Sequence, residues 1–186
     1  AKQDAEWLVR MVENLLSITR ISGSEQANIE KSPELIEEIL GECIANFKKR
    51  NSDVNLKVTI PDEPLMVNVD AMLIEQVIMN LLDNAAKHAE GMTELRLDVK
   101  CSGSWALVSV ADDGAGLDPA IIPVLFRGQI DPADGKSYDS NRFRGIGLAA
   151  CQAIVTAHGG TISAANRPEG GAVFSFTIPL EEEKEE

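Results

Sequence analysis

Apolar residues recur every three or four positions in four stretches of the chain, which is the spacing of one face of an α-helix. The four stretches are residues 7–21, 32–50, 71–88 and 145–158. Ser32 followed by Pro33 is typical of a helix start, and Asp70 suits the N-cap of the third helix. Another short helix is expected within residues 117–126. The pattern therefore predicts four main helices and one short helix.

Apolar and polar residues alternate in six further segments, as expected for half-buried β-strands. These segments are residues 54–60, 65–69, 95–101, 105–111, 161–165 and 172–178. Ser102–Gly103–Ser104 connects one antiparallel hairpin, and Arg167 to Gly171 form the turn of another. This order of elements predicts an α+β fold of the two-layer sandwich type: a mixed sheet covered on one face by helices, preceded by a partial bundle helix.

Breaks in the pattern divide the chain. We expect residues 1–22 to be part of a longer bundle helix, 23–31 a linker, 32–180 the main domain and 181–186 an acidic tail. Residues 127–144 are polar and lack periodicity, and an irregular loop of that length inside a compact domain is usually functional.

Charge and composition exclude some classes of function. The 186 residues include 30 Asp and Glu against 17 Lys and Arg, a net charge of −13, which disfavours nucleic acid and anionic membrane as partners. No stretch approaches 18 uninterrupted apolar residues, so no membrane contact by this chain is expected. Cys43, Cys101 and Cys151 each lie within an apolar pattern and are predicted to be reduced core residues in the cytoplasm.

The segment from Asn80 to His88 is the richest in candidate chemistry. Asn80, Asn84, Lys87 and His88 are three or four positions apart, so they share one stripe of a helix. Carboxamide oxygens can ligate Mg²⁺, carboxamide NH₂ groups can donate to phosphate, and the lysine adds a positive charge. Any one of these residues alone would suit a solvated helix face, but together they favour a binding site.

Two glycine-containing segments supply weaker signals. Asp112–Asp113–Gly114–Ala115–Gly116 follows a predicted strand, where the glycines allow close approach of a ligand and an aspartate can accept from an exocyclic amine. Arg144–Gly145–Ile146–Gly147–Leu148 leads into a predicted helix, whose N-terminus favours an anion. Short glycine patterns are common in turns, so each segment is informative only with the others.

In this order and spacing, the three segments resemble the ATP-binding catalytic domain of sensor histidine kinases, within the Bergerat-type ATPase and kinase superfamily. Similarity extends to Gln152–Ile162, to Asn166–Gly171 and, at the front, to Leu8–Leu16. With these added, the chain is most similar to the C-terminal part of Kdp-type potassium-sensing kinases.

The resemblance implies a role for each matching residue. Asn84 would coordinate Mg²⁺, Asn80 would contact phosphates or the water shell of the metal ion, and Lys87 would bind phosphate, so that Asn80 and Lys87 serve catalysis. Asp112 would accept a hydrogen bond from the adenine amine, and residues 127–144 would form a lid over the nucleotide. The residues implied to bind ATP are Asn80, Asn84, Lys87, His88, Asp112, Gly114, Gly116, Arg142, Arg144, Gly145, Ile146, Gly147 and Leu148.

Members of the superfamily that hydrolyse ATP place a glutamate base four residues before the metal-binding asparagine. Asn80 holds that position here and cannot take a proton, whereas Glu75 lies on another face of the helix. This favours phosphoryl transfer to an imidazole over hydrolysis. Neither His88 nor His158 lies in a motif like that of the family's acceptor, so the acceptor histidine is expected outside the chain.

The resemblance implies three partners: ATP, the protein's own dimerisation and phosphoacceptor domain, and a cognate response regulator. It also implies a homodimer for the full-length protein, with this chain as the cytosolic part of a membrane-bound sensor.

Two other hypotheses stay open. Phe143 stands where the family's second glycine segment has another glycine. The family's phenylalanine-rich segment keeps only Phe126 here, because Gln129 occupies the place of the second phenylalanine. Those departures suit a degenerate nucleotide-binding or protein-interaction module without kinase activity. A homodimerisation fragment, in which the N-terminal helix matters most, is compatible with either.

Overall fold

The computed structural model describes residues 2–23, 29–127 and 141–181, and of residues 3, 4, 7 and 141–144 it describes only the backbone. A five-stranded sheet in the order β2-β4-β5-β7-β6 forms one layer of the fold. Strand β2 runs parallel to β4, and the other neighbours are antiparallel. The strands of this sheet are β2 (Leu56–Thr59), β4 (Leu95–Ser102), β5 (Trp105–Asp112), β6 (Ile162–Asn166) and β7 (Ala172–Pro179).

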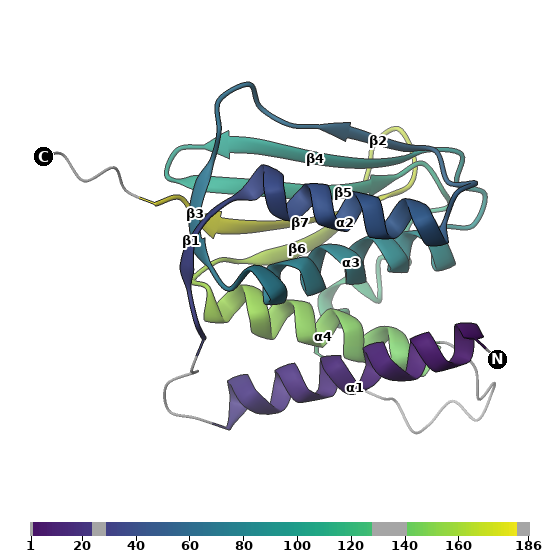
Figure 1. Ribbon diagram of the computed structural model, residues 1–186. Coiled ribbons are helices and arrows are strands. Elements are labelled where there is room, and N and C mark those ends of the chain that lie inside the picture. Colours follow the sequence, from purple (N-terminus) through teal and green to yellow (C-terminus); the bar gives the residue numbers. More distant parts are fainter. Residues whose placement is uncertain (1, 24–28, 128–140, 182–186) are drawn as a thin grey trace, which may run out of the picture.

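Helices form the second layer, as Figure 1 shows. Helices α2 (Ile36–Arg50), α3 (Ala71–His88) and α4 (Asn141–Ala157) lie side by side along one face of the sheet. Helix α1 (Lys2–Ser22) packs along α4, outside this layer. The predicted α+β sandwich with a mixed sheet and a preceding helix is confirmed.

The core lies between the helices and the sheet. It is formed by the apolar stripe of each helix and the inward side of each strand, with Ile78, Leu81, Val108, Ile154 and Phe176 among its fully or almost fully buried residues. Because β5 is paired on both sides, its carboxyl end at Asp112 is fixed beside the start of β7, where Ala111 pairs with Val173. This edge of the sheet carries one of the candidate segments.

The predicted helix start at Ser32 is wrong. Ser32–Leu35 form strand β1, which pairs with β3 (Met66–Val69) in a separate two-stranded sheet, and α2 begins at Ile36. Ser32 donates to the Glu34 carboxylate instead of capping a helix, and Pro33 is tolerated in so short a strand. The Ile36 N–H donates to the Leu65 carbonyl, a contact between residues too far apart for a local pattern to reveal.

Three smaller predictions are corrected. Only Ile122–Val124 of the segment 117–126 are helical, as a single 3₁₀ turn (η1). Helix α4 begins at Asn141, four residues before the predicted Gly145. Cys101 is exposed near the tip of the β4–β5 hairpin, whereas Cys43 and Cys151 are buried, and all three are free thiols. In the described part of the chain, no helix combines the length and apolar character needed to span a membrane.

Candidate functional site

Helix α3 presents the predicted polar stripe. The Asp70 carboxylate caps its N-terminus by accepting the Leu73 N–H (3.3 Å), as predicted. The apolar stripe from Ile74 to Ala85 is buried in the core, so the polar positions face away from the sheet. Asn80, Asn84 and His88 are half-buried, and Lys87 is exposed in the last turn.

Asn80 is engaged by helix α1. Its NH₂ donates to Asn14 Oδ1 (2.9 Å) and approaches the Gly147 carbonyl (3.5 Å), and Gln76 Nε2 donates to the same Asn14 oxygen (2.7 Å). Asn14 is itself buried. The polar stripe is thus part of a carboxamide network that joins α1 to α3, which the sequence pattern did not predict.

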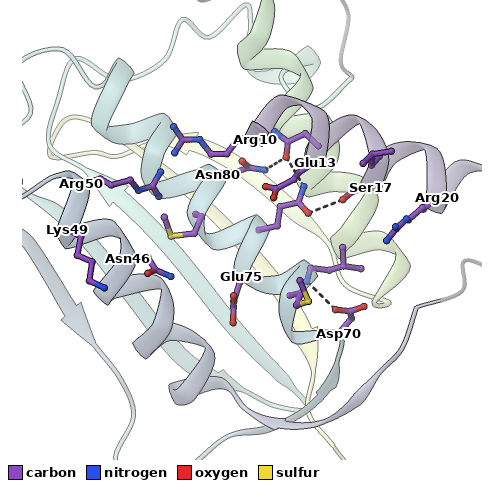
Figure 2. A pocket seen from close by; sticks show the side chains of 16 residues that line it. Arg10, Glu13, Ser17, Arg20, Asn46, Lys49, Arg50, Asp70, Glu75 and Asn80 are labelled. Carbon is purple, nitrogen blue, oxygen red and sulfur yellow. Dashed lines mark hydrogen bonds between the residues drawn. The ribbon is translucent and has the colours of Figure 1, made fainter. Parts of the chain in front are cut away.

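A groove of about 710 Å³ opens between α1, α2 and α3. Figure 2 shows basic and acidic side chains on its walls, among them Arg10, Arg50, Glu13 and Glu75. Of the described residues that line it, Asn80 alone belongs to the predicted site. Within the described residues, the groove and the predicted nucleotide site therefore share only Asn80.

The segment 112–116 forms a tight loop against the end of α3. Asp112 is only 5% exposed, and its Oδ1 accepts the N–H groups of Gly114 (2.9 Å) and Ala172 (3.3 Å). The Ala115 N–H donates to the Glu90 carbonyl (3.0 Å), and a Cβ on Gly114 would lie 2.9 Å from that same oxygen. Glycine at 114 thus allows the loop to approach α3 closely.

Residues 145–148 lie within α4 and not at its first turn. Because α4 begins at Asn141, the N–H groups left free at the helix start belong to residues 141–144, not to Gly145 or Gly147. Gly147 faces α3 and α1, since a Cβ there would stand 3.8 Å from Asn14 Nδ2 and 3.9 Å from Asn80 Cγ. The side chains of Arg142, Phe143 and Arg144, and lid residues 128–140 with Gln129, lie outside the described residues.

Burial and hydrogen bonding shift two pKa values near the end of α3. Partial burial, with the nearby Arg10 guanidinium, lowers the pKa of Lys87. Arg10 pairs with Asp83 at 2.6 Å, and Arg50 lies 3.7 Å from the same carboxylate. The hydroxyl of Thr93 and the N–H groups of Glu94 and Thr93 all donate to Asp113 and lower its pKa to about 2.

Helix α3 brings the three predicted segments together. Asn80 approaches Gly147 of the second glycine segment, and Glu90, just beyond the helix, contacts Gly114 and Ala115 of the first. Asn14 and Arg167 also contact site residues, and Asn166 lies against Gly116, but no role was predicted for these three from the sequence. The sequence signals available were the Asn14 carboxamide within the first predicted helix and the pair Asn166–Arg167 where the predicted turn begins.

Comparison with known proteins gives a consistent result. The profile described as "Histidine kinase-, DNA gyrase B-, and HSP90-like ATPase" matches residues 69–182. The chain is 40% identical over 179 residues to Sensor protein KdpD of Clostridium acetobutylicum, covering 96% of the chain and 20% of that protein. It is 38% identical over 171 residues to Sensor protein KdpD of Escherichia coli, covering 91% and 18%. The chain thus spans about a fifth of the length of these relatives.

Solved structures share the fold. The catalytic domain of histidine kinase ThkA superposes with a TM-score of 0.68 at 25% identity, covering 81% of this chain and 96% of that one. Full-length ShkA in complex with AMPPNP gives a TM-score of 0.76 at 21% identity, covering 96% and 37%. The second likeness extends over α1 as well as the sheet and its helices.

Proposed function

Because the chain belongs to the histidine kinase-, DNA gyrase B-, and HSP90-like ATPase family, we propose that it is the part of a sensor histidine kinase that binds Mg-ATP and transfers its γ-phosphoryl group to a histidine. The observation that carries this proposal is the meeting of three segments at α3: Asn80 beside Gly147, and Glu90 against Gly114. The identity of 40% and 38% to two sensor proteins supports the same activity.

The three segments bind different parts of the nucleotide. Asp112 accepts from the exocyclic amine of adenine, while Gly114 and Gly116 let the base approach the backbone. Asn80, Asn84 and Lys87 take the phosphates, with His88 near the base and the start of α4 (Arg142 to Leu148) beside the phosphate chain. Local cations at Lys87, Arg142 and Arg144 offset the acidic body of the protein.

The residues present fit Mg²⁺. Among the described residues, no cluster of three or more His, Cys, Asp or Glu is arranged to hold a metal ion, whereas Asn84 and Asn80 supply carboxamide oxygens. Mg²⁺ favours oxygen ligands and commonly takes several of them from phosphate and water, which suits so sparse a protein donor set. When bound, Mg²⁺ would neutralise phosphate charge, and Asn84 is the residue that would hold it.

The chain's own residues favour transfer over hydrolysis. Asn80 stands where a base would activate water, and a carboxamide cannot accept that proton. The site residues instead hold the phosphates in line for transfer and offset the phosphate charge. His158 is buried with both ring nitrogens engaged, so it cannot be the acceptor, which we place on a helix of the dimerisation domain outside this chain.

For the whole protein we propose a homodimeric, membrane-bound sensor that responds to potassium and passes phosphate to a response regulator. This follows from the likeness to the KdpD sensor proteins and from the Leu8–Leu16 segment.

Nucleotide binding is the first test. Titration of the chain with Mg-ATP in a calorimeter is expected to show saturable binding, with Asp112→Ala and Asn84→Ala each weakening it about tenfold or more because each deletes a charged or metal-linked contact. Asp53→Ala, in an exposed loop, is the matched control and should bind as the wild type does. Absence of saturable binding, or an Asp112→Ala variant with unchanged affinity, would contradict the proposal.

Phosphoryl transfer is the second test. The full-length sensor incubated with γ-labelled ATP should form an acid-labile phosphohistidine, and Asn84→Ala should abolish the label. ATP binding without any labelling would favour the degenerate module over the kinase.

A further inference from the structure

The turn between β6 and β7 holds the loop that carries Asp112. Asn166 ends β6 opposite Ala172, and the turn closes through a hydrogen bond from the Arg167 N–H to the Gly171 carbonyl (2.9 Å). Both Asn166 and Arg167 lie outside the three segments assigned to the nucleotide. Their side chains nevertheless reach the two ends of the loop 112–117.

Arg167 holds the first end. Its Nη1 donates to the Asp112 carbonyl (2.7 Å), and the Arg167 side chain is only 17% exposed. Gly171 lies directly against the same carbonyl, since a Cβ there would come within 2.0 Å of that oxygen, and its φ is +84°. The Ala172 N–H, next in the chain, donates to Asp112 Oδ1 (3.3 Å). Main chain and side chain of Asp112 are therefore both fixed from this turn.

Asn166 holds the other end. Its Oδ1 accepts the Leu117 N–H (2.7 Å), and its Nδ2 donates to the Leu117 carbonyl (2.8 Å), so one carboxamide satisfies both backbone groups of Leu117. Gly116 adopts φ +80°, and a Cβ on it would lie 2.8 Å from Asn166 Oδ1. Because Gly116 has no Cβ, it leaves room for the Asn166 side chain. Glycine also makes the loop backbone more flexible, and the two hydrogen bonds from Asn166 restrict that flexibility.

We infer that Asn166 and Arg167 are positioning residues that set the selectivity of the site for a 6-aminopurine over a 6-oxopurine. The inference rests on the proposed function, in which Asp112 accepts from the exocyclic amine. A carboxylate attracts an amine donor and repels the lone pairs of a carbonyl at the same place, so discrimination depends on where the carboxylate is held. If the hydrogen bonds from Arg167 or from Asn166 are lost, the loop can move and Asp112 shifts away from the purine edge. Discrimination between the two purines then weakens more than phosphate binding does.

The experiment compares Mg-ATP with Mg-ITP, which carries a carbonyl in place of the amine. The wild-type chain is expected to prefer ATP by about tenfold or more, the scale of one well-placed polar contact. In Asn166→Ala the affinity for ATP falls about tenfold while that for ITP changes less than about twofold, so selectivity is lost. Arg167→Met acts in the same direction, and Asn166→Asp, which keeps the acceptor for the Leu117 N–H, restores part of the preference.

Asn68→Ala, which removes an exposed carboxamide from β3, is the matched control and keeps the wild-type ratio. Thermal unfolding of each variant establishes that it is folded at the titration temperature. Equal loss of both nucleotides in Asn166→Ala would show an ordinary structural role and overturn the inference, as would an unchanged ratio. A wild-type chain that binds neither nucleotide refutes the proposed function itself, whereas Asp112-dependent ATP binding with an Asn166-independent ratio refutes only this inference.

Discussion

His158 joins the end of α4 to the start of α3 through both nitrogens of its ring. Nδ1 lies 2.7 Å from the Ile154 carbonyl and acts as a donor, so Nε2 is left to accept the Asp70 N–H at 3.0 Å. His158 as a whole is 3% exposed. A proton added at Nε2 would face another N–H, and burial, assisted by Lys31, lowers the pKa of His158 below its ordinary value of 6.5.

Stability should therefore fall on mild acidification. Because the folded pKa of His158 lies below the unfolded one, its contribution is fully present above about pH 6.5 and is lost as the pH falls through the folded pKa. Urea unfolding at about pH 7.5 and about pH 5.5 should show a smaller free energy of unfolding at the lower pH. His158→Gln should lack this component of the loss, and a wild type whose decrease matches that of the variant would contradict the assignment.

At the level of elements, α1 packs along α4 and is joined to α3 by polar contacts. Asn14 accepts from both Gln76 and Asn80, Ser17 Oγ donates to Gln76 (2.9 Å), and Arg10 pairs with Asp83. Much of the apolar surface of α1 is exposed, including Leu8, Val9, Val12, Leu15 and Leu16. Hydrogen bonds of the buried Asn14 carboxamide and its neighbours therefore fix where this helix lies along α3.

Asn14→Ala should destabilise the chain by about 1–3 kcal/mol, because it leaves the NH₂ groups of Gln76 and Asn80 without their common acceptor. The measurement is the free energy of unfolding from urea denaturation. Glu13→Ala, at the neighbouring exposed position, is the control and should change it by less than about 0.5 kcal/mol. Equal values for the two variants would mean that α1 is not docked in this way in solution.

The elements that could be predicted from the sequence are those whose signals are local. Helix α3 and the β4–β5 hairpin carry their own periodicity, and Asp70 caps as predicted because its partner Leu73 is three residues away. Strand β1 could not be predicted, because its four residues become a strand only by pairing with β3, more than thirty positions along the chain. The same distinction applies to the site. Asp112 and Asn84 stand in contiguous motifs and could be predicted, whereas Asn14 is 66 residues from its partner Asn80 and Asn166 is 49 residues from its partner Leu117.

At the scale of the whole molecule, a net charge of −13 acts on any phosphate ligand that approaches. Free ATP is highly anionic, and long-range repulsion from an acidic body lowers both its encounter rate and its affinity. Partial burial lowers the pKa of Lys87, one of the cations proposed to bind phosphate. Under the proposed function, a metal ion carried with the nucleotide adds to the neutralisation that Lys87, Arg142 and Arg144 supply.

Removal of Mg²⁺ should consequently weaken ATP binding by about tenfold or more, as measured by titration in a chelator. Part of this loss should be recovered on raising salt from about 50 mM to about 300 mM, because screening shortens the reach of the repulsion between acidic surface and phosphate. In Asn84→Ala, which lacks the carboxamide proposed to hold the metal ion, the chelator should make less than about a threefold difference. ATP that binds the wild type equally well with and without Mg²⁺ would show that the chain neutralises the phosphates by its own cations, and would transfer that role to residues near the start of α4.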